Sequence, residues 1–310
     1  MSAKKTLQPT TPLVSVIMVS YNTRAYTVKA MQTALDSRGF KPGEIEVIMV
    51  DNNSPDDTVA YTRKHLPMVR VIANKDNKGF GGGNNQAIAE SKGKYLLLLN
   101  PDAFLAPDSL RIMTDILINN DDIVSVGPQL RYKNGELQQS AGYLPTPLRV
   151  TAWMLWLDKI PGVKSLFSTP YHVFDLNWHK TDHYPEWLMG ACIMFRREEF
   201  IAAGGFDDKI FMYAEEVELY RRLKESLGKK VFFTTKTQVV HIGSVSTKKA
   251  NAYRLNYELK GIEYIYRKHY HGLYWYIKGV ITLGVIMRLA LFALIPSRRD
   301  TLVEYRKYFS

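Results

Sequence analysis

The turn Asn100-Pro101-Asp102 directly follows an apolar segment and ends in a carboxylate. A carboxylate beside a proline-fixed turn presents hard oxygen ligands in one direction, and a divalent cation that bridges two phosphates needs such oxygens. The alternative is a capped turn, in which Asp102 accepts hydrogen bonds from nearby backbone amides. The tripeptide by itself leaves both interpretations open.

A cluster of three carboxylates, Glu215, Glu216 and Glu218, is the second group that could do chemistry. Transfer to a hydroxyl group needs a general base to take its proton, and a carboxylate can supply one. The alternative is an acidic first helical turn that opposes the helix dipole ahead of Arg221 and Arg222.

His241 follows a predicted strand and precedes Gly243. An imidazole can bind a borderline ion such as manganese, whereas magnesium strongly prefers oxygen, so His241 is a candidate metal ligand. A packed or surface histidine is the alternative. Cys192 lies on an apolar segment and is interpreted as a buried small residue, not a nucleophile.

The first half of the chain alternates short apolar segments with helix-compatible ones. Strands are predicted over residues 13–19, 45–50, 69–72 and 95–99, and helices over 26–37, 56–65 and from near Asn84. This alternation predicts an α/β fold with a mostly parallel sheet and helices on both faces. In such sheets, ligands bind beyond the carboxyl ends of the strands.

Polar segments fall at three of those carboxyl ends, at residues 20–22, 51–54 and 100–102. A stable sheet does not need polar loops at all three ends, so their coincidence indicates a binding site. The glycine-rich segment 77–83 is predicted to be a loop that lets the backbone approach a ligand ahead of a helix. A dinucleotide-binding oxidoreductase would carry its glycines after the first strand and is disfavoured.

The second half is less regular. Residues 127–184 hold several prolines and aromatic residues and are expected to cover the sheet as a lid or an acceptor surface. Strands are predicted over 187–195 and 231–240, and helices over 198–203 and 215–227, the latter ending at Gly228.

The composition is that of a folded protein, with 46% hydrophobic and 23% charged residues among 310. This length allows one large α/β domain with an extension, or two small domains. Residues 1–12 are polar and contain no secretory signal, so we expect a cytoplasmic location, and the single cysteine fits a reducing compartment. The net charge of +11 favours anionic lipid or phosphorylated ligands, and no nucleic-acid-binding pattern is present.

Residues 252–309 are predicted to be helical and basic, with an apolar stretch over 272–296 that Lys278 and Arg288 interrupt. The basic flanks and the aromatic residues 274–276 favour a helix that lies in the cytoplasmic leaflet of a membrane. A packed core helix, a dimer helix and a membrane span are the alternatives.

Several motifs occur in an order and spacing that resemble glycosyltransferase family 2, and most of all its rhamnosyltransferase-type branch. They are residues 14–22, 50–54, 77–84, 96–102, 187, 190–192, 211–213, 215–223 and 241. The resemblance covers roughly residues 12–250. It implies a GT-A fold, inverting chemistry, a nucleotide-diphosphate sugar donor, and Mn²⁺ or Mg²⁺.

The resemblance also implies roles by position. Asn100 and Asp102 fall on the family's D-x-D element, so Asn100 is expected to bond a ribose or phosphate and Asp102, with His241, to hold the metal. Glu216 takes the place of the general base, where the family has Asp, and Glu215 is the alternative. The expected acceptor-wall residues are Trp187, Gly190 and Ala191. The residues expected to bind the nucleotide sugar are Ser20, Tyr21, Asn22, Asp51, Asn77, Gly79, Phe80, Asn84, Asn100 and Asp102.

We therefore expect transfer of L-rhamnose from dTDP-rhamnose to a lipid-linked glycan in cell-surface polysaccharide synthesis, at the inner face of the cell membrane. Galactofuranose, glucose and mannose donors stay open, as do a nucleotidyltransferase, a non-catalytic sugar-nucleotide-binding protein and a homodimer. The expected organisation is a disordered tail over 1–12, a GT-A domain over 13–250 and a membrane-associating helical extension over 251–310. The GT-A domain is expected to divide into a nucleotide-binding half up to 126 and an acceptor half from 127.

Overall fold

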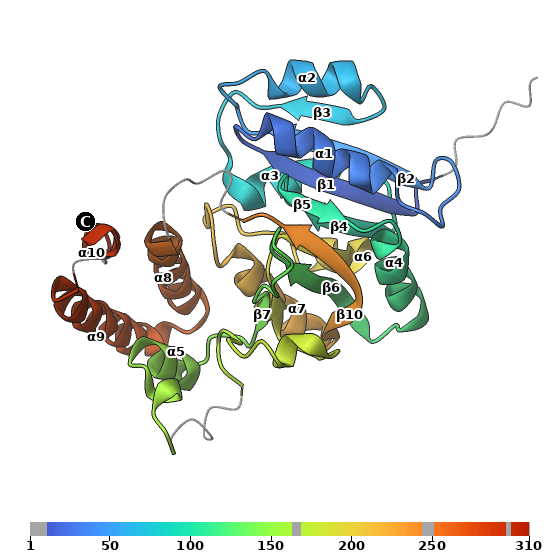
Figure 1. The fold of residues 1–310 in the computed structure, drawn as a ribbon. Helices are drawn as coiled ribbons and strands as arrows, with labels where there is room; N and C mark the ends of the chain where they lie inside the picture. Colours follow the sequence, from blue (N-terminus) through green and yellow to red (C-terminus); the bar gives the residue numbers. More distant parts are fainter. Residues whose placement is uncertain (1–10, 163–168, 244–250, 296–298, 310) are drawn as a thin grey trace, which may run out of the picture.

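The computed structural model describes residues 11–162, 169–243, 251–295 and 299–309, so most of the predicted N-terminal tail lies outside the described residues. The described chain folds around an eight-stranded sheet of order β3-β2-β1-β4-β9-β6-β10-β5 (Figure 1). Its strands are β1 (Val14–Ser20), β2 (Ile45–Asp51), β3 (Arg70–Ala73), β4 (Tyr95–Leu99), β5 (Ala103–Leu105), β6 (Ile123–Arg131), β9 (Cys192–Arg196) and β10 (Lys230–His241).

The predicted α/β class is confirmed. Strands β1, β2, β3 and β4 are parallel neighbours, and β6 is parallel to β10. Strand β9 runs antiparallel to β4 and β6, and β5 runs antiparallel to β10. The helices that follow the strands are α1 (Arg24–Leu35), α2 (Thr58–His65), α3 (Gly79–Glu90), α4 (Ser109–Asn119), α6 (Arg197–Ala202) and α7 (Glu215–Leu227).

Apolar side chains cover both faces of the sheet, because successive residues of a strand point to opposite faces. Ile17 and Leu98 belong to one buried cluster, and Val16 and Leu97 belong to the other. This double cover explains why the predicted strands are apolar throughout and not alternating.

Two expectations for the second half are wrong. The predicted strand over 187–195 is broken at residues 189–191, because β8 (Trp187–Leu188) leaves the main sheet to pair with β7 (Ala141–Gly142). The region predicted to be irregular from residue 127 also begins with regular structure, because β6 continues to Arg131. Short 3₁₀ turns lie at Leu157–Lys159, Trp178–Lys180 and His271–Leu273.

The glycine-rich segment is largely helical where the sequence predicts a loop, since α3 begins at Gly79 and not near Asn84. A Cβ on Gly79, whose φ is +72°, would lie 2.3 Å from the carbonyl oxygen of Phe211. A Cβ on Gly83 would lie 2.9 Å from the side chain of Val19. These glycines therefore allow α3 to pack closely against β1 and against the segment that leads into α7.

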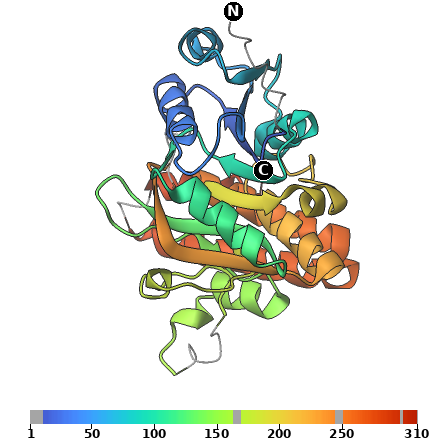
Figure 2. The same ribbon diagram turned by 90° about the vertical axis from the view of Figure 1, so that its right-hand side faces the viewer.

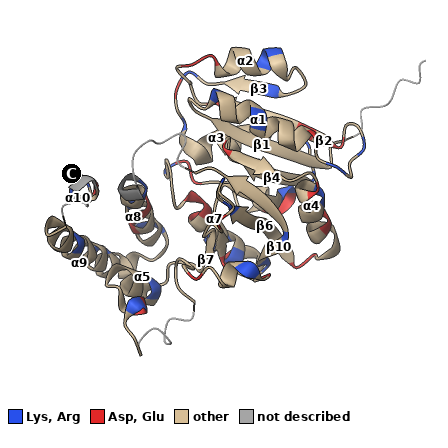
Figure 3. Cartoon of the chain, viewed as in Figure 1, with Lys and Arg blue, Asp and Glu red and all other residues tan. Residues whose placement is uncertain are grey.

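The C-terminal helices form a group with α5 (Pro147–Met154), beside the sheet and on the side away from α4 (Figure 1). They are α8 (Asn251–His269), α9 (Tyr274–Ala293) and α10 (Arg299–Arg306). In the view turned by 90°, α2 lies at one end of the molecule and α5 at the other (Figure 2). Helix α9 packs against α5, α8 and α10, and it carries few charged side chains (Figure 3).

Arg288 of α9 is buried, although the sequence places it on the same sector as Lys278. Its guanidinium donates hydrogen bonds to the carbonyl oxygens of Trp153 and Met154 at the end of α5, and it lies 4.3 Å from the ring centroid of Trp156. Arg288 therefore joins α9 to α5 and does not face outward.

Candidate active site

A cavity of about 600 Å³ opens at the carboxyl ends of β1 and β4, and its volume is typical of a small-molecule site. It is lined by residues from both halves of the sheet and from α8. Most of the predicted site residues meet there: Tyr21, Asn77, Gly79, Phe80, Asn100, Asp102, Trp187, Gly190, Ala191, Glu215, Glu216 and His241.

Four residues predicted to bind the nucleotide sugar do not line this cavity. The Ser20 hydroxyl is buried against Thr23 and Thr27, and the Asn84 amide donates to the carbonyl oxygen of Phe80 at 2.8 Å. Asn22 is exposed, with a left-handed backbone at φ +54°. Ser20 thus ends β1 and Asn84 lies within α3, and neither side chain lines the cavity.

Asp51 is the fourth of these residues. Its Oδ2 accepts a hydrogen bond from the backbone N–H of Ser54 at 2.8 Å, which is the capping role that the sequence allows. Its Oδ1 is buried and has no hydrogen-bond partner among the described residues. A buried oxygen without a hydrogen-bond partner is costly, so the environment of Oδ1 is not explained by the described residues alone.

Asp102 and His241 are brought together by the antiparallel pairing of β5 with β10, in which His241 lies opposite Ala103. Both side chains are buried, and Asp102 Oδ1 lies 3.4 Å from His241 Nε2. Asp102 Oδ2 accepts from the Gly243 N–H at 3.0 Å, and His241 Nδ1 lies 2.8 Å from Gln138 Oε1. Gln138 therefore fixes the imidazole with Nε2 turned toward Asp102.

The donor set fits a divalent cation in chemical type, with one carboxylate and one imidazole nitrogen. No group of three or more His, Cys, Asp or Glu side chains within the described ranges is placed to hold a metal. Asp102 and His241 would thus leave most coordination positions to ligand oxygens. Residues 244–250, which follow His241 and Gly243, lie outside the described residues.

A strained turn positions the acidic cluster at the start of α7. Tyr213 and Ala214 both have left-handed backbones, at φ +64° and +73°. The turn is held from two sides, because Gly79 packs on Phe211 and a Cβ on Gly261 of α8 would lie 2.7 Å from the Ala214 Cβ. Such strain persists where packing over-determines the backbone, as at functional sites.

Glu215 is buried in the cavity wall, and Glu216 is half-buried beside it with its Oε2 atom shielded from solvent. Glu216 Oε1 accepts from the Gly190 N–H at 3.3 Å, and Oε2 has no partner among the side chains and backbone that the structure describes. Burial raises the pKa of Glu216, and burial followed by the neighbouring Glu216 charge raises the pKa of Glu215 well above its usual value. A carboxylate with a raised pKa and a free oxygen is suited to accept a proton.

Glu218 has a structural environment. It is fully buried and forms ion pairs with Arg222 at 2.6 Å, Lys268 at 2.8 Å and His269 at 2.8 Å. It does not line the cavity, so the acidic cluster divides into two cavity carboxylates and one that ties α7 to α8.

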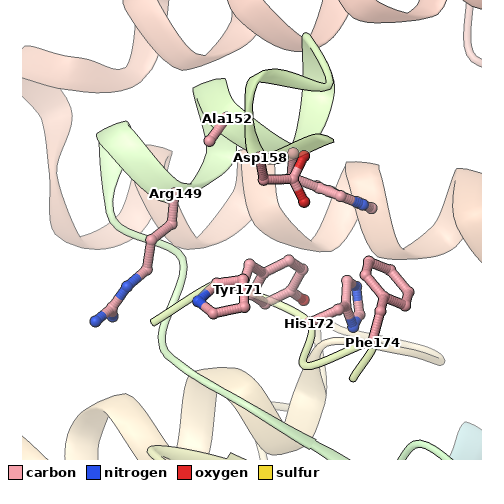
Figure 4. Close-up of a pocket in the computed structure, with 8 residues that line it drawn as sticks. Arg149, Ala152, Asp158, Tyr171, His172 and Phe174 are labelled. Atoms are coloured by element: carbon pink, nitrogen blue, oxygen red, sulfur yellow. The ribbon is translucent and has the colours of Figure 1, made fainter. Parts of the chain in front are cut away.

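Trp187, which is predicted for the acceptor wall, packs in an aromatic cluster with residues of the segment 127–184. The Trp187 indole N–H donates to the carbonyl oxygen of Tyr171 at 3.0 Å, and the Tyr171 and His172 rings lie 4.2 Å apart. Behind this wall lies a water-sized cavity of about 10 Å³ (Figure 4).

Helix α8 supplies two cavity residues that were missed, Arg254 and Glu258. Glu258 Oε1 accepts from the Tyr171 hydroxyl at 2.9 Å and lies 2.8 Å from His172 Nε2. Burial opposes its ionisation, but His172, Arg254 and Tyr171 together lower the pKa of Glu258 to about 2. The four-residue spacing of Arg254 and Glu258 on a predicted helix was the available signal, but that helix was interpreted as a membrane extension.

Solved structures share this architecture, which is a GT-A-like fold. The mannosyltransferase PcManGT from Pyrobaculum calidifontis, in complex with GDP-Man and Mn²⁺, matches with a TM-score of 0.55 and 14% identity over 96% of this chain and 85% of that one. GalNAc-T7 with UDP, GalNAc and Mn²⁺ matches with a TM-score of 0.54 and 14% identity, over 82% of this chain and 49% of that one.

Residues 15–201 match glycosyl transferase family 2, and the chain belongs to this family. It is 27% identical to the N-acetylglucosaminyl-diphospho-decaprenol L-rhamnosyltransferase of Mycobacterium tuberculosis over 74% of this chain and 77% of that one. It is 28% identical to the O-antigen biosynthesis protein RfbC of Myxococcus xanthus over 76% of this chain and 18% of that one. The protein is thus a nucleotide-sugar glycosyltransferase of polysaccharide synthesis, in a family whose members are inverting.

Proposed function

We propose that this enzyme transfers L-rhamnose from dTDP-rhamnose to a hydroxyl group of a lipid-linked glycan. The observation that carries the chemistry is that one cavity contains both the Asp102–His241 pair and the carboxylates of Glu215 and Glu216. The likeness to a rhamnosyltransferase named for a diphospho-decaprenol acceptor supports the sugar and the acceptor class.

Asp102 and His241 are proposed to hold Mn²⁺ or Mg²⁺, as the Mn²⁺ in the two structural neighbours suggests. When bound, the ion supplies positive charge that stabilises the leaving nucleoside diphosphate. Asn100 lines the same cavity, and as a neutral amide it is suited to bond a ribose or phosphate oxygen.

Glu216 is proposed as the general base. Its Oε2 takes the proton of the acceptor hydroxyl as the oxygen attacks the anomeric carbon, and the bond from that carbon to the diphosphate oxygen breaks in the same displacement. The Gly190 N–H holds Oε1, so the free oxygen is presented in one orientation. Glu215 is the alternative base.

Product analysis with a donor panel tests this function. The full-length enzyme is incubated with dTDP-rhamnose, a UDP-galactofuranose, UDP-glucose or GDP-mannose donor and a short-chain lipid-diphosphate N-acetylglucosamine acceptor, with Mn²⁺, Mg²⁺ or a chelator. We expect a rhamnosylated product that needs the metal. Preferred transfer of another sugar would overturn the rhamnose assignment, and no transfer from any donor would overturn the enzymatic function.

We also propose that the protein attaches to the inner face of the cell membrane through α9. The segment His271–Ala293 is long and apolar enough to cross a membrane, with a mean hydropathy of 1.7. One face of α9 is buried against the protein, through Ile277, Ile281 and Val285. The exposed apolar side chains are Trp275, Tyr276, Leu283, Ile286, Met287, Leu291 and Leu294.

This exposed face suits a bilayer surface better than a span, because the opposite face packs on the protein. Trp275 is 73% exposed and Leu294 is 81% exposed, which would be unfavourable in water. Lys278 lies over the rings of Tyr274 and Trp275, at the depth where aromatic and basic side chains meet lipid headgroups.

Vesicle co-sedimentation tests the attachment. We expect wild-type protein to bind vesicles that contain anionic lipid, and Leu283→Asp with Ile286→Asp to abolish binding. Met68→Asp is the control, because Met68 is 66% exposed but lies far from α9, beside β3. Self-association through α9 without vesicle binding would contradict the proposal.

A further inference from the structure

Arg254 is a cation placed in a cavity that is otherwise acidic. Among the described residues that line the cavity, it is the one Lys or Arg, against the carboxylates of Asp102, Glu215, Glu216 and Glu258. It lies outside the matched family segment, which ends at residue 201. The C-terminal helix α8 therefore brings a permanent positive charge into the site.

The Arg254 guanidinium lies over an aromatic ring in the turn before α7. It lies 5.8 Å from the ring centroid of Tyr213, and it makes no hydrogen bond or ion pair with any residue in the described ranges, although Glu258 is one helical turn away. The side chain is half-buried. An arginine that lines a cavity with its donors unpaired is suited to bind a planar or tetrahedral oxyanion, because its N–H groups match phosphate oxygens.

The neighbours of Arg254 place it at the base end of the cavity. Burial raises the pKa of Glu216, and the Arg254 charge acts in the opposite direction, as it does on Glu258. Glu258 in turn bonds Tyr171, whose carbonyl oxygen accepts from Trp187 of the acceptor wall. Arg254 is thus connected to Trp187 of the predicted acceptor wall, whereas Asp102 lies in the turn between β4 and β5 and His241 ends β10.

We propose that Arg254 binds a phosphate of the acceptor, so that the acceptor is a sugar carrying a phosphate or diphosphate, with its hydroxyl directed at Glu216. This inference rests on the proposed function and names the anionic group that the enzyme requires on its acceptor. The donor also contains phosphate, so the same chemistry has a second source, and the experiment must separate the two.

Two acceptors that carry the same sugar separate these sources. One is a short-chain lipid-diphosphate glycoside and the other is a neutral alkyl glycoside. For Arg254→Gln we expect KM for the diphosphate acceptor to rise about ten- to hundredfold, as for loss of charged hydrogen bonds, with KM for the neutral acceptor and the dissociation constant of the donor unchanged. For Arg254→Lys, KM for the diphosphate acceptor should lie between the wild-type and Arg254→Gln values, because lysine keeps the charge but lacks the paired N–H donors of the guanidinium.

Arg267→Gln is the matched control, since Arg267 lies exposed on the same helix and should leave every constant unchanged. A parallel loss of donor affinity in Arg254→Gln would assign the guanidinium to the donor diphosphate and overturn the proposal. An equal loss with both acceptors would show a structural role and also overturn it.

Binding without turnover keeps this test separate from that of the proposed function. A short-chain alkyl diphosphate is titrated into the full-length protein in the presence of saturating nucleoside diphosphate. We expect wild-type protein to bind this probe and Arg254→Gln to lose binding at least tenfold. Equal binding by both proteins would overturn the assignment, whether or not any donor sugar is transferred.

Discussion

The backbone N–H of Gly190 donates to Oε1 of Glu216 across 3.3 Å, which joins the break between β8 and β9 to the first turn of α7. A Cβ at Gly190 would lie 3.2 Å from the ring of Phe80, so the close approach favours glycine at this position. The interruption of the predicted strand is therefore what orients the carboxylate, with Oε2 left without a hydrogen-bond partner among the described residues.

Replacing Glu216 by Gln should lower kcat by about 10²- to 10⁴-fold, the usual contribution of a general base. The donor dissociation constant should stay near the wild-type value, because the amide keeps the hydrogen bond from Gly190. Steady-state kinetics and donor titration measure the two quantities. Glu225→Gln, in the exposed part of the same helix, is the control, and full turnover by Glu216→Gln would assign the base elsewhere.

The pH dependence should report the carboxylate pair. Burial raises the pKa of Glu216, and burial followed by repulsion from Glu216 raises that of Glu215, so kcat/KM should rise with pH as the pair loses its proton. Glu215→Gln removes one negative charge, and the rising limb should move to lower pH. An unmoved limb would show that the two carboxylates do not titrate together.

The same shift predicts an effect on stability. A carboxylate whose pKa is higher in the folded than in the unfolded state stabilises the fold less as the pH rises above its pKa in the unfolded state. Glu215→Gln should therefore raise the melting temperature at neutral pH and have less effect in acid. A melting temperature that falls equally at both pH values would instead indicate a packing role for the side chain.

The strands β1 to β4 could be predicted from sequence because they are short, mostly apolar segments separated by helical spacers, and such patterns identify strands. The break at residues 189–191 could not, because it depends on the pairing of β8 with β7, which are distant in sequence. Asp102 and His241 are candidates from their local sequence, and the family resemblance is what pairs them as expected metal ligands. The roles of Gln138 and Arg254 required the tertiary arrangement, since neither lies in a recognisable motif.

Gln138 should tune the candidate metal site without contacting a metal. Its Oε1 lies 2.8 Å from His241 Nδ1, and loss of such an orienting bond costs about 10- to 100-fold in metal affinity or activity. Gln138→Leu should raise the Mn²⁺ concentration that gives half-maximal activity, with kcat recovering at high Mn²⁺. The exposed neighbour Gln139 provides the control variant Gln139→Leu. An unchanged metal requirement would argue against His241 as a ligand.

Arg288→Ala should destabilise the junction of α5 with α9. The change leaves the carbonyl oxygens of Trp153 and Met154 without their charged donor, at a cost of about 3 kcal/mol. Thermal unfolding measures the loss, and hydrogen exchange should increase in peptides that cover α5. Lys278→Ala, also on α9, should have a much smaller effect. A comparable loss of stability in the two variants would show that the hydrogen bonds of Arg288 to α5 do not stabilise the junction.

Two glycine-to-alanine changes in the C-terminal helices should differ in their effect on kcat. A Cβ on Gly261 would lie 2.7 Å from the Ala214 Cβ and 3.0 Å from the Tyr213 carbonyl oxygen, whereas a Cβ on Gly279 meets nothing within 4 Å. Gly261→Ala should therefore displace the strained turn that positions Glu216 and lower kcat, while the fold stays intact by circular dichroism.

Gly279→Ala should leave kcat unchanged and stabilise α9 by about 0.5–1 kcal/mol, the ordinary gain for alanine over glycine within a helix. Unchanged kcat in Gly261→Ala would mean that the turn accommodates the methyl group and that α8 does not hold the base in place. A lowered kcat in Gly261→Ala alone would instead establish that α8 is part of the catalytic structure, since both variants replace glycine by alanine within a helix.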